Sequence, residues 1–276
     1  MRPAFFNKQL AIRSAQFAVA VVRRYCTLQA FGCAPLGILL YIVAINEKIS
    51  YNKRKTERYI MPKYKAVVFD MDGTILYTLK DLQICINHLL NKYGYPERTI
   101  EEVRSFVGNG IKPLIERAFP ADAQIDMNKL FPEMMDYYRV HCLDTTYPYE
   151  GIPEVMKSLR EGGVKVAIVS NKPDLAVNKL SEIFFNGLYD IAVGEIAGLK
   201  KKPAPDEVFY ALDKLGVDKN DAVYVGDSDI DMATAKNSQM DCISVSWGFK
   251  TRGFLESMNA SPIIDKPEEI LDIVLN

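Results

Sequence analysis

Histidine is scarce in this 276-residue sequence, and its cysteines show no paired spacing. It holds only two histidines, His88 and His141, which argues against a His-rich metal centre and against a His-based catalytic triad. Its five cysteines are scattered and odd in number, with no CxxC or Cys/His spacing of a metal site. We therefore expect free thiols in a reducing compartment.

An overall excess of charge is also missing, because the formal net charge is only −1. This value hides an asymmetry: residues 1–60 hold ten Lys or Arg against two Asp or Glu, a net charge of +8, and residues 61–276 carry −9. A basic head on an acidic body suggests membrane or nucleic-acid attachment, or a head that is not part of the functional protein. We expect no nucleic-acid partner.

Long apolar runs are limited to residues 28–45, which carry no charge and just reach the length of a bilayer span. This segment is a signal anchor, a targeting segment, or sequence translated from a misplaced start. Met61 directly precedes the first predicted strand, as a natural N-terminus would. We expect a cytoplasmic protein, with a single-pass membrane anchor at 28–45 as the alternative.

From residue 61 onward, helical and strand patterns follow a defined order. A strand at 65–69 precedes a helical block, and helices then alternate with strands from residue 151 on. Alternation of this kind predicts a parallel sheet with helices on both faces. The expected division is an extension at 1–60, a catalytic core at 61–77 and 149–276, and an inserted helical cap at 78–148.

Asp70-Met71-Asp72-Gly73-Thr74 is the most informative stretch, because it directly follows the apolar run 66–69. Ligands of open parallel sheets bind beyond the carboxyl ends of the strands. Residues i and i+2 of a strand project to the same side, so both acids can meet one substrate. Paired acids of this kind can divide the roles of nucleophile and acid/base.

Three further polar clusters follow predicted strands or precede helices: Ser170-Asn171-Lys172, Lys202-Pro203, and Gly226-Asp227-Ser228-Asp229-Ile230-Asp231. A hydroxyl and backbone amides at a helix start suit a phosphate oxyanion. A lysine stiffened by proline can neutralise phosphate and carboxylate charge. Asp227 and Asp231 offer the oxygen ligands that Mg²⁺ prefers.

These four motifs, in this order, resemble those of the haloacid dehalogenase-like hydrolase superfamily over about residues 64–276. The resemblance implies an α/β fold, a doubly wound parallel Rossmann-like sheet with an inserted alpha-helical cap. It implies a phosphatase that uses Mg²⁺ and forms an aspartyl-phosphate, with a small phosphorylated metabolite as substrate. The oligomeric state is left open.

The resemblance also implies a role for each motif residue. Asp70 is the nucleophile and Asp72 the acid/base, and both join Asp227 as metal ligands, Asp72 through its main-chain carbonyl. The phosphate-binding residues are Ser170, Asn171 and Lys202, and the supporting residues are Asp231, Thr74 and Gly226. In the cap, Asn109, Lys112 and Arg117 either meet a substrate carboxylate or are surface groups.

Asp72 favours ester hydrolysis, because dehalogenase and phosphonatase members lack an acid at this position. The cap loop Phe106-Val107-Gly108-Asn109-Gly110-Ile111 and the segment 241–249 after the fourth motif resemble those of the phosphoglycolate phosphatase subgroup. This resemblance implies 2-phosphoglycolate as the substrate. The alternatives are a sugar-phosphate or nucleotide phosphatase, a pyrophosphatase and a phosphomutase. A membrane-tethered protein that binds phosphate ligands without turnover is the hypothesis from another class.

Overall fold

The structure of this protein is a computed structural model that describes residues 62–276. The predicted extension at 1–60 and the candidate membrane anchor at 28–45 lie outside the described residues. Among residues 62–276, no helix combines the length and the apolar character that crossing a bilayer requires.

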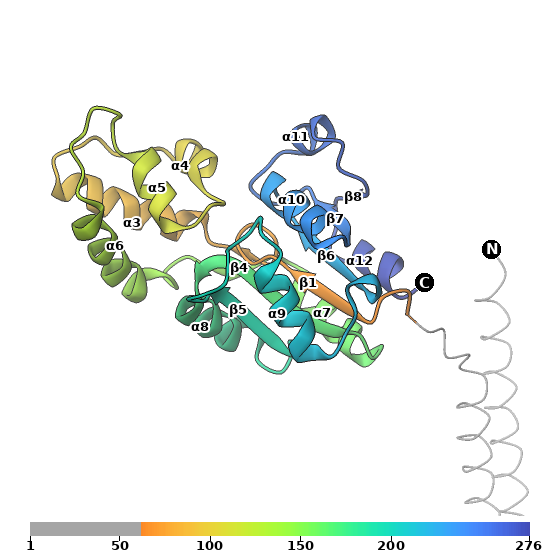
Figure 1. Ribbon diagram of the computed structural model, residues 1–276. Coiled ribbons are helices and arrows are strands. Elements are labelled where there is room, and N and C mark those ends of the chain that lie inside the picture. The colour runs from red at the N-terminus through yellow and green to blue at the C-terminus, as the bar shows by residue number, and fades with distance from the viewer. Residues whose placement is uncertain (1–61) are drawn as a thin grey trace, which may run out of the picture. The chain divides into compact units, whose positions relative to one another are not determined.

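A six-stranded sheet, in which all neighbours pair in parallel, forms the centre of the core (Figure 1). Its order is β5-β4-β1-β6-β7-β8. The strands are β1 (Ala66–Phe69), β4 (Lys165–Pro173), β5 (Ile191–Glu195), β6 (Ala222–Gly226), β7 (Asp241–Val245) and β8 (Ile263–Ile264). The chain builds outward from β1 to one side and then from β6 to the other. Such a reversal is the point at which open α/β sheets bind ligands.

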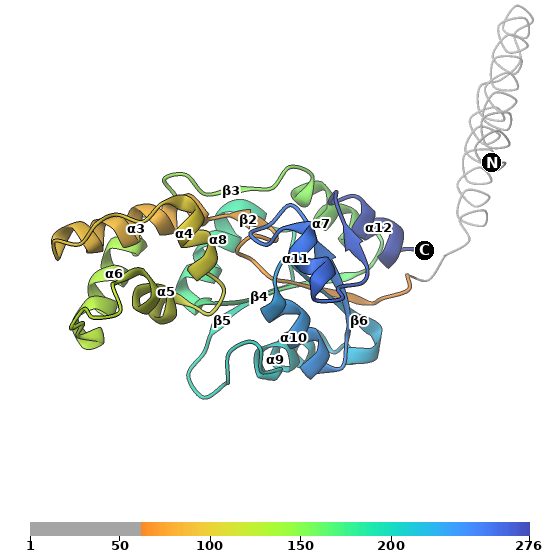
Figure 2. The same ribbon diagram turned by 90° about the horizontal axis from the view of Figure 1, so that it is seen from above.

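Helices cover both faces of this sheet (Figure 2). One face packs against α7 (Ile152–Glu161), α8 (Asp174–Phe185) and α12 (Glu269–Val274), and the other against α9 (Asp206–Leu215) and α10 (Asp229–Ser238). Val67 and Phe69 of β1 join the first apolar cluster, and Ala66 and Val68 join the second. Because both faces of the strand are buried, β1 reads as a continuous apolar run.

Four helices between residues 79 and 141 form a separate lobe (Figure 1). They are α3 (Leu79–Lys92), α4 (Ile100–Phe106), α5 (Ile111–Ala118) and α6 (Met127–His141). Their apolar faces share a cluster of their own, which includes Leu89, Leu114 and Met134. This packing supports our proposal that residues 78–148 form the cap and that 61–77 and 149–276 form the core.

Two short strands, β2 (Leu76–Tyr77) and β3 (Tyr147–Pro148), pair antiparallel where the chain enters and leaves the cap. The rings of Tyr77 and Tyr147 stack there, with centroids 5.2 Å apart. The sequence did not predict these two strands. Helix α11 (Arg252–Ser257), after β7, was also not predicted.

The predicted α/β class is confirmed, as are the doubly wound parallel sheet and the inserted helical cap. The predicted helices and strands lie close to the observed ones. One difference is at β4: the apolar run predicts a strand over 164–170, and the observed strand continues to Pro173. The Ser170-Asn171-Lys172 cluster is therefore part of β4 rather than of the turn after it.

Candidate active site

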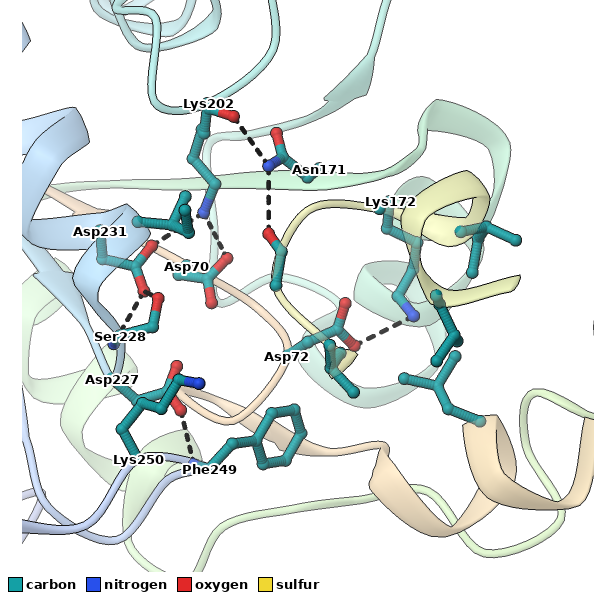
Figure 3. A pocket seen from close by; sticks show the side chains of 17 residues that line it. Asp70, Asp72, Asn171, Lys172, Lys202, Asp227, Ser228, Asp231, Phe249 and Lys250 are labelled. Carbon is teal, nitrogen blue, oxygen red and sulfur yellow. Dashed lines mark hydrogen bonds and ion pairs between the residues drawn. The ribbon is translucent and has the colours of Figure 1, made fainter. Parts of the chain in front are cut away.

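Residues from the carboxyl ends of the central strands line one pocket of about 50 Å³ (Figure 3). Asp70 follows β1, Asn171 and Lys172 belong to the end of β4, and Asp227 follows β6. Lys202 reaches the same pocket from the segment between β5 and α9. A single water needs about 10–15 Å³ on this measure, so the pocket can hold a small polar group.

Lys202 lies between two carboxylates on the floor of the pocket. Its Nζ is 2.6 Å from Asp70 Oδ1 and 3.0 Å from Asp231 Oδ1, and it donates to the Tyr224 hydroxyl at 2.9 Å. Burial lowers the pKa of Lys202, but the charges of Asp231 and Asp70 outweigh burial and raise the pKa well above its usual value. Lys202 is therefore a fixed positive charge beside Asp70.

The carboxylates at this floor are crowded. One carboxylate oxygen from each of Asp70, Asp227 and Asp231 lies within 4.8 Å of the others, and all three residues are buried. Burial, followed by the charge of Asp231, raises the pKa of Asp70 to about 7. The same two causes raise the pKa of Asp227 well above its usual value. A site with several close carboxylates and one lysine is short of positive charge, and its oxygen-only donors fit Mg²⁺.

Asp231 is held at both of its oxygens. Oδ1 accepts from Lys202 and Tyr224, and Oδ2 accepts from the Ser228 backbone N–H at 3.1 Å and from its hydroxyl at 2.6 Å. Gly226 makes room for this arrangement, because a Cβ at that position would lie 2.2 Å from the Asp231 Cβ. Asp231 and Gly226 thus support the site by fixing Lys202.

Asp227 is oriented by a backbone group and a hydroxyl. Its Oδ2 accepts from the Phe249 N–H at 2.5 Å. The buried Thr74 hydroxyl lies 3.4 Å from both Asp70 Oδ2 and Asp227 Oδ1. Because the Phe249 side chain belongs to the apolar cluster of the cap, the loop after β7 connects the cap with the carboxylate floor.

Asp72 lies on the side of the pocket nearest the cap. Its Oδ1 accepts from the Thr78 hydroxyl at 2.5 Å and lies 3.0 Å from Lys172 Nζ. Its side chain is 19% exposed, against 9% for Asp70. Within residues 62–276 no hydrogen bond or ion pair engages Oδ2, so this oxygen is available to a ligand.

The cap closes the pocket with apolar side chains and glycine backbone. The apolar residues are Leu82, Val107, Ile111 and Leu114. Asn171 joins this wall to the core, because its amide donates to the Gly108 carbonyl at 3.2 Å and to the Lys202 carbonyl at 3.0 Å. The cap therefore adds shape and water exclusion rather than charge.

One residue of the predicted phosphate-binding set lies off the pocket. Ser170 is buried in β4, and its hydroxyl accepts from the Lys172 backbone N–H at 3.3 Å. Asn171 and Lys202, the other two members, line the pocket.

The three candidate specificity residues of the cap do not line the pocket either. Asn109 contacts the core through its carbonyl, which accepts from Lys201 Nζ at 3.2 Å. Lys112 and Arg117 are exposed. The Lys112 ammonium lies 5.0 Å from the centre of the Phe131 ring, and the Arg117 guanidinium donates to the Phe106 carbonyl at 2.7 Å.

No role was predicted for the pocket residues Lys172, Ser228, Phe249 and Lys250. None was predicted either for Tyr224, which does not line the pocket but accepts a hydrogen bond from Lys202. Lys172 belongs to the Ser170-Asn171-Lys172 cluster noted in the sequence, but no role was predicted for it. Tyr224 carried no signal, because within the apolar run of β6 it reads as a core residue.

Comparison with known proteins gives consistent results. The family model described as "Haloacid dehalogenase-like hydrolase" matches residues 67–245. A phosphoglycolate phosphatase of Pseudomonas savastanoi pv. phaseolicola is 30% identical over 215 residues, which are 75% of this chain and 78% of that protein. A phosphoglycolate phosphatase of Aquifex aeolicus is 28% identical over 217 residues, 77% of this chain and 97% of that protein.

Solved structures share the fold. A protein of Lactobacillus delbrueckii subsp. bulgaricus, described provisionally as a phosphoglycolate phosphatase, superposes with a TM-score of 0.72. It is 39% identical, and the match covers 76% of this chain and 98% of that one.

Proposed function

The chain belongs to the haloacid dehalogenase-like hydrolases and is a phosphatase of that superfamily, and we propose that it hydrolyses 2-phosphoglycolate with the help of Mg²⁺. The observation that carries the proposal is the convergence of Asp70, Lys202 and Asp227 at one pocket floor, with Asp72 on the wall beside them.

Asp70 is the proposed nucleophile. One of its carboxylate oxygens attacks phosphorus, a P–O bond forms to Asp70, and the ester P–O bond breaks to release the alcohol. Lys202 supports this step in two ways: it fixes the carboxylate at 2.6 Å, and it supplies positive charge for the phosphoryl oxygens. Asn171, the other predicted phosphate-binding residue that lines the pocket, uses both amide N–H groups on the Gly108 and Lys202 carbonyls, so its amide positions Lys202 and does not donate to phosphate.

Asp72 is the proposed acid/base. It gives its proton to the departing ester oxygen, so that the alcohol leaves neutral, and then takes a proton from the water that attacks the phosphorus of phospho-Asp70. Inorganic phosphate leaves and the Asp70 carboxylate is restored. The contacts of Asp72 suit this role, because Thr78 and Lys172 hold one oxygen and the other is open to the pocket.

Asp70 and Asp227 are the side chains that would hold Mg²⁺, with the Asp72 main-chain carbonyl as a further ligand. When bound, Mg²⁺ would relieve the crowding of the carboxylates and draw charge from the phosphoryl oxygens. Thr74, between the two carboxylates, and the Phe249 N–H keep Asp70 and Asp227 in place.

The choice of 2-phosphoglycolate as substrate rests on the relatives named phosphoglycolate phosphatase and on the apolar wall of the pocket. Leu82, Val107, Ile111 and Leu114 offer no hydrogen bond to the hydroxyl groups of a sugar. A compact substrate fits this wall better than a polyol does.

A phosphate-release assay of the whole chain tests this proposal. The panel contains 2-phosphoglycolate, sugar phosphates, a nucleoside monophosphate and pyrophosphate, and product analysis with a sugar 1-phosphate detects mutase activity. We expect the highest kcat/KM for 2-phosphoglycolate, loss of activity in EDTA with recovery in Mg²⁺, and a decrease in kcat on the order of 10⁴-fold in Asp70→Asn. Full activity of Asp70→Asn would exclude it as the nucleophile, and a strong preference for another panel member would overturn the substrate.

A further inference from the structure

Lys172 is a buried cation of the pocket to which the reaction above gives no direct role. It lies at the end of β4 and its side chain is only 2% exposed. Its Nζ is 3.0 Å from Asp72 Oδ1 and donates to the Tyr138 hydroxyl at 2.5 Å. Figure 3 shows its ammonium directed at Asp72, on the side of the pocket away from Lys202.

The ammonium of Lys172 has capacity for one more ligand. It carries three N–H donors, and two partners, Asp72 and Tyr138, account for two of them within the described chain. Lys172 also contributes to the pocket lining. A ligand atom in the pocket can therefore reach the remaining donor.

The other cations of the pocket are differently placed. Lys202 is engaged by Asp70, Asp231 and Tyr224 at the phosphate end. Lys250 is partly exposed, and its Nζ lies 5.4 Å from the centre of the Phe254 ring. Among the pocket lysines of residues 62–276, Lys172 alone is both buried and next to the acid/base.

We propose that Lys172 determines substrate specificity by binding a carboxylate carried by the leaving alcohol. This inference rests on the proposed function, because it takes Asp72 as the group that protonates the ester oxygen. It assigns the substrates to phosphate esters of 2-hydroxy acids, in which the carboxylate is attached to the carbon that bears the ester oxygen.

The geometry favours this substrate class for a simple reason. The ester oxygen must come within hydrogen-bond distance of Asp72 to receive a proton, and Lys172 contacts that same carboxyl group. A substituent that reaches Lys172 must therefore lie close to the ester oxygen. A carboxylate on the adjacent carbon meets this requirement and forms a charged hydrogen bond, which in a buried site is stronger than one to a neutral hydroxyl.

Exchange of Lys172 for methionine in the whole chain tests the proposal. The two substrates are 2-phosphoglycolate and 2-hydroxyethyl phosphate, which has a neutral CH₂OH in place of the carboxylate. We expect the wild type to prefer 2-phosphoglycolate. In Lys172→Met, kcat/KM for 2-phosphoglycolate falls roughly 100-fold, and kcat/KM for 2-hydroxyethyl phosphate falls much less.

Two further variants keep the test decisive. Lys172→Gln removes the charge but keeps an amide for Asp72 and Tyr138, so it answers the same question if the methionine variant does not fold. Lys250→Met is the matched control, because it removes an equal charge from the same pocket. We expect it to change kcat/KM for both substrates by a similar factor and to leave the preference in place.

The contrary outcomes separate this inference from the proposed function. An equal loss for both substrates in Lys172→Met would make Lys172 a positioning residue for Asp72 and overturn its role in specificity. Loss of the preference in Lys250→Met alone would assign the carboxylate to Lys250. A wild type that hydrolyses both esters equally is still a phosphatase and contradicts only this inference. A wild type that hydrolyses no phosphate ester contradicts the proposed function, and this inference with it.

Discussion

The cap and the core treat their buried carboxylates in opposite ways. Within the described part of the cap, the buried carboxylate is Asp81, and it accepts four hydrogen bonds from the backbone and hydroxyl groups of Thr145 and Thr146, at 2.6–3.0 Å. The core buries several carboxylates close together, and burial together with a neighbouring negative charge raises the pKa of Asp70 to about 7.

The buried charge of the cap therefore serves structure, whereas the crowded charges of the core serve chemistry. Asp81 joins the start of α3 to the segment that leaves the cap, so its hydrogen bonds hold the two connections of the cap together. The core carboxylates are crowded at the cost of stability, which is expected where a ligand or metal completes the site. We infer that the cap is built for stability and shape, and that the chemistry lies in the core.

Of the replacements considered, that of Asp81 in the cap should have the largest effect on the stability of the protein. Asp81→Asn keeps the size but replaces one acceptor oxygen by a donor, which then faces N–H and O–H groups. We expect the free energy of unfolding to fall by about 4 kcal/mol and the Tm by roughly 10 °C, as measured by denaturant and thermal unfolding. A Tm within a degree or two of the wild type would show that these hydrogen bonds do not secure the cap.

Replacement of Glu207, in the first turn of α9 in the core, should stabilise the protein, whereas replacement of Asp81 in the cap destabilises it. Glu207 is fully buried, and neither carboxylate oxygen makes a hydrogen bond of ordinary geometry among residues 62–276, although the Lys202 backbone N–H faces the carboxyl group. Burial raises the pKa of Glu207 to about 7, although the Lys202 charge opposes the shift. The folded state therefore binds the proton of Glu207 more tightly than the unfolded state, in which the pKa of this carboxyl group is near 4.5.

The pKa of Glu207 makes the stability of the protein depend on pH. The stabilising contribution of its protonated carboxyl group is complete below pH 4.5 and is lost as the pH rises through about 7. We expect Glu207→Gln to stabilise the protein by about 1–2 kcal/mol at pH 8 and by much less at pH 5, because the amide is also buried but cannot ionise. Unfolding of both proteins in urea at the two pH values measures this. A difference that is the same at pH 5 and pH 8 would show that Glu207 does not titrate in this range.

Much of the core could be predicted from sequence, because its signals are local. Asp70, Asn171 and Asp227 each stand at or just after the end of an apolar run, and parallel strands bring their ends to one edge of the sheet. Order along the chain was therefore enough to place these residues together. Lys202 was found for a related reason, since the proline beside it and the helix after it mark a fixed turn.

The rest of the site depends on contacts between distant segments. The contact between Lys172 and Tyr138 could not be predicted, because Tyr138 lies on α6 of the cap and no local sequence pattern connects the two residues. The placement of Lys112 and Arg117 is set by how α5 packs within the cap, and both are exposed residues whose charged groups contact other parts of the cap. Polar residues of a helical insertion show from sequence only that they are polar, and not which of them faces a ligand.

The central claim, that Asp70 of the core forms a phosphoenzyme, is tested most directly by acid-quenched turnover of Asp72→Asn with ³²P-labelled 4-nitrophenyl phosphate, followed by peptide mapping. Nitrophenolate leaves without a proton, so phosphoryl transfer proceeds, whereas the attack of water lacks its base and the intermediate accumulates. We predict alkali-labile phosphate on the peptide that contains Asp70. Release of nitrophenol at the wild-type rate with no labelled protein, or label on another residue, would contradict the claim.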